Sequence, residues 1–255
     1  MMLPTKQLAL ELSDQFFQIS EIDNSRVELL GSVELFGRST DELQAEILKV
    51  LEGLDINEKY DSYTMSWISH QFTLVPIAIF STASLEAMYH LCFEKKSMHG
   101  EISFDIMNEQ SMVVIYEIPD WIKSFFIHRF PRLLIQHSFT HLIRGVIDRS
   151  HQKTSIHLSI FESNFHVALF EDKKLLVANS YEYENEDDLI YYSLFCLKQT
   201  NASFSEGELT VHLSKPDLSP IIEQFFVKWK KVNDYASYKQ SFELNSLLKL
   251  QLSCV

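Results

Sequence analysis

The sequence predicts an α/β protein with mixed sheets, in which the element order β-β-β-α-β-α occurs twice. Two observations predict this. Apolar residues alternate with a period of two over some short segments, as in strands, and follow helical spacing over others. The two sets of segments also have the same order and register about 148 residues apart, with Leu10 matching Leu158 and Phe17 matching Phe165. We therefore expect one duplicated unit.

The first set of elements lies in residues 1–96. Three strands come first, followed by a helix, a fourth strand and a second helix. The residues that mark these elements are, in order, 8–12, 17–19, 27–35, 43–54, 63–67 and 85–92. Ser39 and Glu42 have the spacing of a capping box, in which each side chain bonds the other residue's backbone N–H, so the first helix should begin there.

The second set lies in residues 151–255 and repeats this order. Its strands and helices are marked by residues 156–160, 165–169, 173–180, 189–197, 209–213 and 222–229. Asn185 is a suitable N-cap for the first helix, and Pro220 fits the first turn of the second. The stretch from Asn233 onward has a mixed pattern, and we assign no element to it.

Residues 97–150 are expected to connect the two halves. Two alternating segments, 102–106 and 113–116, predict a hairpin that turns at Asn108. Two helices should follow, because Pro119 and Pro131 each precede a helical pattern and proline suits the start of a helix. The predicted domains are therefore 1–96, 97–150 and 151–255.

Charge and composition exclude several classes of protein. The chain has 22 basic and 35 acidic residues, a net charge of −13, which disfavours binding to nucleic acid or to an anionic membrane surface. No apolar segment approaches the roughly 18 residues of a membrane span, and no secretory signal is evident. The three cysteines are widely separated and lack CxxC spacing, which is typical of a reducing compartment. We expect a cytoplasmic protein without membrane insertion.

Motifs for metal binding or nucleophilic catalysis are weak. His137 and His141 are four residues apart on a predicted helix and could share a metal, but no glutamate completes an HExxH motif, so packed core histidines are favoured. One acidic run precedes a predicted helix: Glu182, Glu184, Glu186, Asp187 and Asp188. Carboxylates are favoured at that end of a helix, so we interpret the run as structural. Neither a P-loop nor GxSxG occurs, and we assign no metal and no catalytic residue.

Three segments give the chain a resemblance to a known family: residues 71–80 (QFTLVPIAIF), 179–192 (NSYEYENEDDLIYY) and 242–250 (FELNSLLKL). They resemble an uncharacterised bacterial family, a domain of unknown function with the actin-like ATPase (ribonuclease H-like) fold. The resemblance covers nearly the whole chain. It implies a two-lobed fold, and it implies no activity.

The resemblance also indicates where a nucleotide would bind. Actin-like ATPases hold it between the halves, where glycine-containing hairpins bring backbone N–H groups to the phosphates. The matching positions here are Asp14, Gln15 and Phe16, then Glu162, Ser163 and Asn164, then Ser214 and Lys215. None of these positions is a glycine. We therefore expect no cofactor, with ATP and Mg²⁺ as the alternative.

An unusual concentration of aromatic residues follows Pro119. Trp121, Phe125, Phe126 and Phe130 lie on a predicted helix that is aromatic nearly all round. One buried face does not need so many rings, so the helix is either deeply buried or presents a patch for a partner.

Two functions remain in competition. The first is a catalytically silent actin-like protein, an intracellular binding or scaffold module with an unidentified protein partner. The second is a weak Mg²⁺-dependent ATPase in which Asp14 positions the metal. A ribonuclease H-type nuclease is disfavoured by the net charge. The oligomeric state is not predicted.

Overall fold

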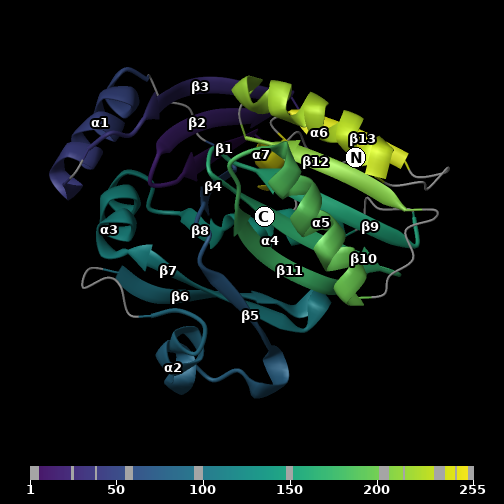
Figure 1. Cartoon of the computed structure of the whole chain (residues 1–255). Coiled ribbons are helices and arrows are strands. Elements are labelled where there is room, and N and C mark those ends of the chain that lie inside the picture. The colour runs from purple at the N-terminus through teal and green to yellow at the C-terminus, as the bar shows by residue number, and fades with distance from the viewer. Residues whose placement is uncertain are drawn as a thin grey trace, which may run out of the picture. The chain divides into compact units, whose positions relative to one another are not determined.

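Two five-stranded mixed sheets with the same strand order form the framework of the protein (Figure 1). The computed structural model describes residues 6–23, 26–37, 39–54, 60–94, 100–147, 152–200, 207–214, 216–232, 239–244 and 246–251. The chain divides into two compact units: Met1–His141 with Leu248–Val255 (unit 1), and Leu142–Leu247 (unit 2). The predicted α/β class with mixed sheets is confirmed.

The sheet of unit 1 has the order β3-β2-β1-β4-β8. Its strands are β1 (Lys6–Leu12), β2 (Phe16–Asp23), β3 (Arg26–Glu34), β4 (Ser62–Trp67) and β8 (Leu133–His137). β1 pairs antiparallel with β2 and parallel with β4, which in turn pairs parallel with β8. Both faces of β1 are buried, because every residue after Lys6 is inaccessible to solvent.

Two helices connect the strands of this sheet: α1 (Thr40–Glu52) and α3 (Asp120–Arg129). The predicted capping box at the start of α1 is confirmed: the Glu42 backbone N–H donates to Ser39 Oγ, and the Ser39 N–H donates to the Glu42 carboxylate. Gly31 of β3 allows α1 to pack closely, since a Cβ there would lie 2.7 Å from Cγ1 of Val50.

A small sheet of order β5-β7-β6 is inserted between β4 and α3. The elements of this insertion are β5 (Phe72–Pro76), η1 (Ile77–Ile79), η2 (Thr82–Ser84), α2 (Leu85–His90), β6 (Gly100–Met107), η3 (Asn108–Gln110) and β7 (Met112–Pro119). Val75, Tyr89, Val113 and Ile115 form its core. The predicted hairpin with its turn at Asn108 is confirmed as β6–β7.

Unit 2 repeats the strand order of unit 1 as β11-β10-β9-β12-β13. Its strands are β9 (Thr154–Ile160), β10 (Asn164–Glu171), β11 (Lys174–Glu182), β12 (Glu208–Leu213) and β13 (Lys239–Leu244). Its helices are α5 (Glu186–Thr200), η4 (Pro216–Leu218) and α6 (Ser219–Val232). Leu10 faces Ile19 across β1–β2, and the matching Leu158 faces Val167 across β9–β10.

Part of the predicted element order is wrong. The segment after Pro131 was predicted to be helical, but residues Leu133–His137 form β8, and α4 (Ser138–Val146) begins only afterwards. Pairing with β4 places this short segment in the sheet, and a long-range contact of this kind leaves no local signal. By its position in the order, α3 is also the counterpart of α6, whereas the predicted helix at 85–92 is α2 of the insertion.

The unit boundaries lie elsewhere than the expected breaks near residues 96 and 150. Pairing of β7 with β5 and of β8 with β4 joins most of the expected connector to unit 1. The C-terminal stretch, to which no element was assigned, forms β13 and α7 (Ser246–Gln251). Residues from Leu248 onward belong to unit 1, because Leu248 packs against Ala9 and Ile22.

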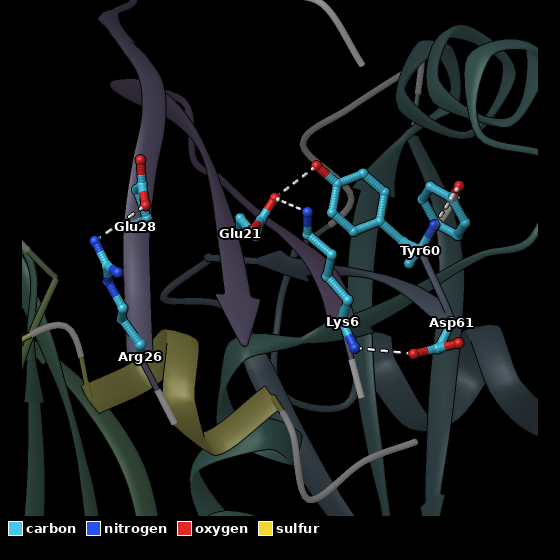
Figure 2. Close-up of polar contacts among 7 residues, drawn as sticks. Lys6, Glu21, Arg26, Glu28, Tyr60 and Asp61 are labelled. Carbon is cyan, nitrogen blue, oxygen red and sulfur yellow. Dashed lines mark hydrogen bonds and ion pairs between the residues drawn. The ribbon is translucent and has the colours of Figure 1, made fainter. Parts of the chain in front are cut away.

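Polar contacts join the beginning of β1 to its neighbours (Figure 2). Lys6 Nζ lies 3.0 Å from Glu21 Oε2, and the Tyr60 hydroxyl donates to the same oxygen. The Lys6 backbone N–H donates to Asp61 Oδ2 at 2.9 Å. The Asp61 N–H donates to the Lys6 carbonyl in return. Among the described residues, no helix is long and apolar enough to cross a membrane.

Candidate functional site

The β1–β2 hairpin is the first of the predicted nucleotide positions. The Ser13 N–H donates to the Phe16 carbonyl at 2.9 Å, which closes the turn. Ser13 Oγ then accepts the backbone N–H groups of both Gln15 and Phe16, each at 3.0 Å. Two of the donors that could approach an anion are therefore satisfied inside the turn itself.

The side chains of this hairpin point in different directions. Asp14 and Gln15 are exposed, whereas Phe16 is 1% exposed and packs in the interior of unit 1. The Gln15 carbonyl accepts the backbone N–H of Leu35 at 2.7 Å, which ties the turn to the end of β3. The structure thus leaves Asp14 as the accessible acidic group of the turn and buries the predicted position Phe16.

The β9–β10 hairpin of unit 2 is closed by different groups. The Phe161 N–H donates to the Asn164 carbonyl at 2.9 Å, as in the first hairpin. Here Tyr183 completes the closure: its N–H donates to the Ser163 carbonyl, and its hydroxyl donates to the Phe161 carbonyl. Burial raises the pKa of the Tyr183 hydroxyl to about 12, so it remains a donor at neutral pH.

The remaining predicted positions follow β12. Ser214 is buried, and its hydroxyl donates to the Ile160 carbonyl at 3.4 Å, so it joins the ends of β9 and β12. Lys215 lies outside the described residues. Glu162 and Asn164 are half-buried and Ser163 is exposed, so the structure brings these three together in one turn with Ser214 close by.

A buried carboxyl group beside the first hairpin was missed by the sequence analysis. Glu11 is the penultimate residue of β1 and is fully buried. Gln18 Nε2 donates to its Oε2, while Oε1 has no hydrogen-bond partner among the described residues. Ser66 faces it from β4, and the Ser66 hydroxyl is likewise without a partner there. Desolvation raises the pKa of Glu11 to about 7, against the smaller lowering effect of Gln18.

A carboxyl group with a pKa near neutrality can hold or release a proton, as a general acid or base does. Catalysis also requires contact with a substrate, and Glu11 has no exposed surface. The sheet face that carries it is covered by α7, where Gln251 donates to the Leu10 carbonyl and accepts from the Thr64 hydroxyl. Because no element was assigned after residue 233, this covering could not be foreseen.

His137, the first residue of the histidine pair, is held in place by hydrogen bonds. His137 Nδ1 accepts the backbone N–H of Phe139 at 3.1 Å, and Nε2 lies 3.1 Å from the Ser69 carbonyl. Both nitrogens are thereby engaged, and burial lowers the pKa of His137 to about 3, so the ring is neutral. Within the described part of the chain, no three His, Cys, Asp or Glu side chains gather as metal ligands.

The acidic run before α5 forms a helix start with ion pairs. Asp188 Oδ2 accepts the backbone N–H of Glu184 at 2.9 Å, and Asn185 Oδ1 accepts that of Asp187 at 2.9 Å, so the predicted Asn185 cap is present. Lys228 of α6 lies 2.7 Å from Glu186 and 2.9 Å from Asp187. Its hydrogen bond lowers the pKa of the Glu186 carboxyl.

The aromatic residues of α3 are largely internal. Phe125, Phe126 and Phe130 are buried and Trp121 is half-buried. Phe126 packs against Phe17 of β2, with ring centroids 5.7 Å apart. Three of the four aromatic side chains are therefore internal, while the opposite side of α3 is exposed at Ile127.

Comparisons with known proteins identify the family to which the chain belongs. The model of a family described as "Protein of unknown function (DUF3822)" matches residues 3–215, so the chain belongs to that family. No protein with a curated description matches the sequence. A Bacteroides thetaiotaomicron VPI-5482 protein of actin-like ATPase fold and unknown function is 21% identical, with a TM-score of 0.79 over 98% of this chain and 96% of that one. The resemblance to an uncharacterised family with the actin-like ATPase fold is confirmed.

Two further structures share the fold at 8% identity. The PilM–PilN type IV pilus biogenesis complex matches with a TM-score of 0.51, over 96% of this chain and 94% of that one. A ROK family glucokinase from Streptomyces griseus, in complex with glucose and AMPPNP, matches with a TM-score of 0.50 over 98% of both chains. The fold is thus found both in a pilus biogenesis complex and in an enzyme, so it does not decide the function.

Proposed function

We propose that this member of the DUF3822 family is a catalytically silent actin-like protein that acts by binding another protein. The observation that carries the proposal is the closed β1–β2 hairpin, in which Ser13 Oγ takes the N–H groups of Gln15 and Phe16. A bound triphosphate needs such donors to compensate its charge. With them engaged inside the turn, the hairpin has lost its main means of holding phosphate.

The second hairpin supports the same proposal. Tyr183 closes its turn with two hydrogen bonds, from its backbone N–H and from its hydroxyl. Ser163 and Asn164 occupy positions at which a glycine would permit close approach of a phosphate. An added Cβ at such a position blocks that approach sterically. Loss of the phosphate contacts in both hairpins is what we expect of a protein that keeps the framework for another purpose.

Protein binding is proposed by analogy of fold. The PilM–PilN complex shows that a chain of this fold can belong to an assembly of proteins. The analogy concerns the fold alone and does not name a partner. The net charge of −13 supports a protein partner over nucleic acid. We further expect a cytoplasmic protein built from one duplicated unit.

Isothermal titration of the full chain with Mg-ATP tests the proposal. We expect no heat of binding, and sub-millimolar affinity would overturn it. The alternative, a weak Mg²⁺-dependent ATPase, is favoured by the exposed position of Asp14 in the hairpin. In that case Asp14→Ala should abolish nucleotide turnover with little change in melting temperature, and wild-type protein without turnover would reject the alternative.

A further inference from the structure

A groove runs between α1 and α3 in unit 1. Two adjoining cavities of about 580 and 560 Å³ share Leu48 of α1 and Arg129 of α3 in their walls. Along α1 the walls extend from Asp41 to Glu52, roughly 16 Å at about 1.5 Å per residue. We call this the α1–α3 groove. Its shape suits an elongated ligand.

The walls of the larger cavity are partly apolar. Leu48 and Leu51 of α1 face Phe130, which follows α3, and Tyr63 of β4 also contributes. Phe130 and Tyr63 pack together with ring centroids 5.9 Å apart, so this wall is internally supported. A cavity of this volume with apolar walls and a few polar groups has the features of a small-molecule site.

Two arginines line the same cavity. The Arg129 guanidinium lies over the Phe125 ring at 4.2 Å, and its Nη1 donates to the Phe125 carbonyl at 3.1 Å. This stacking fixes the plane of the group and leaves further N–H donors for a ligand. Within the described residues, neither Arg129 nor Arg132 forms an ion pair with a carboxylate. A guanidinium held in this way matches a carboxylate with two parallel hydrogen bonds.

The balance of charge in the larger cavity favours an anion. Arg129 and Arg132 line the larger cavity together with one acidic residue, Glu52, and Asp41 lies in the smaller one. We propose that the α1–α3 groove binds a small organic anion with an elongated apolar body and a carboxylate head. The two arginines bind the head, and the body lies along Leu48 and Phe130. The site is separate from the hairpins and does not depend on the proposed function.

Isothermal titration of the full chain with decanoate tests this inference, below the concentration at which decanoate forms micelles. We expect one binding site, and binding weakened at least tenfold in the double variant Arg129→Gln, Arg132→Gln. Decyltrimethylammonium has the same apolar body with a cationic head and should bind at least tenfold more weakly than decanoate. Arg26→Gln is the matched control, because Arg26 is an exposed arginine of β3 paired with Glu28, and it should leave decanoate binding unchanged.

Arg129 packs on Phe125, so its replacement could disturb the fold. The single variant Arg132→Gln avoids this problem, because Arg132 is exposed, and it should still weaken decanoate binding severalfold at an unchanged melting temperature. The inference is overturned if decanoate does not bind, if the arginine variants bind it as the wild type does, or if the cationic analogue binds equally well. A peptide of alternating leucine and glutamate that outcompetes decanoate would assign the groove to a protein segment and overturn it as well.

Discussion

The β1–β2 and β9–β10 hairpins have the same closing hydrogen bond but are stabilised by different side chains. In each, the first residue after the strand donates its N–H across the turn at 2.9 Å, Ser13 to Phe16 and Phe161 to Asn164. The Ser13 hydroxyl oxygen then accepts two backbone N–H groups of its own turn, whereas the Phe161 carbonyl accepts the hydroxyl of Tyr183, the residue that follows β11. The two hairpins therefore share the backbone hydrogen bond that closes the turn and differ in the side chains beside it.

The buried sheet faces next to these hairpins differ in the same way. Glu11 of β1 matches Ser159 of β9, and Gln18 of β2 matches His166 of β10, since each pair occupies the same register position. All four are buried. An ionisable carboxyl group at Glu11 thus corresponds to a hydroxyl group at Ser159, so substitutions at these two matched positions should differ in their pH dependence.

Removal of a large side chain from the matched second strands should have the largest effect. Phe17 packs on Phe126, while Phe165 lies among three tyrosine rings, those of Tyr181, Tyr183 and Tyr192. Both are fully buried, so Phe17→Ala and Phe165→Ala should each lower the free energy of unfolding by about 3–5 kcal/mol, measured by urea denaturation. We expect the larger loss for Phe165→Ala, and the reverse order would contradict the view that its aromatic surroundings are the denser.

Glu11→Gln should remove a pH dependence that arises in unit 1. The pKa of Glu11 is raised from 4.5 to about 7 on folding, so the folded state holds the proton more tightly than the unfolded chain. The wild type therefore loses stability as the pH rises between these two values, by about 3 kcal/mol in all. The variant should match the wild type at about pH 4 and exceed it by about 3 kcal/mol at about pH 8, measured by denaturation across this range.

Ser159→Ala is the matched variant for unit 2. Serine does not titrate in this range, so the difference between Ser159→Ala and the wild type should be independent of pH. A flat difference for Glu11→Gln as well would show that Glu11 ionises at its ordinary pKa. A difference that grows toward acid would reverse the sign expected from burial.

The elements with local signals were the ones the sequence could predict. The capping box at Ser39 and the N-cap at Asn185 depend on residues close in the chain, and both are present. β8 and α7 are short and are positioned by distant segments: β8 pairs with β4, and α7 bonds residues of β1 and β4 through Gln251. Their sequences therefore lacked a local pattern strong enough to identify them.

Only part of the candidate site could be predicted from the sequence. The absence of glycine from both hairpins can be read from the residues at positions 14–16 and 162–164. The hydrogen bonds from Gln15 and Phe16 to Ser13 Oγ depend on the geometry of the turn. Serine side chains often accept backbone N–H groups two or three residues later in the chain, so this closure had a recognised local pattern. Glu11 is buried because β1 is a central strand and both faces of the sheet are covered there. The alternating pattern of the strand does not show that its second face is covered.

The smallest expected effect separates the two hairpins themselves. Ser13→Ala removes a buried side-chain oxygen that accepts two backbone N–H groups, so the free energy of unfolding should fall by about 1 kcal/mol. The amides of Gln15 and Phe16 should exchange with solvent faster, as NMR hydrogen exchange would measure. Ser163→Ala is the control, because the Ser163 side chain is exposed and the turn uses only its carbonyl, so stability should change by less than about 0.5 kcal/mol. Equal losses in the two variants, or unchanged exchange at Gln15 and Phe16, would mean that Ser13 does not hold the first hairpin closed.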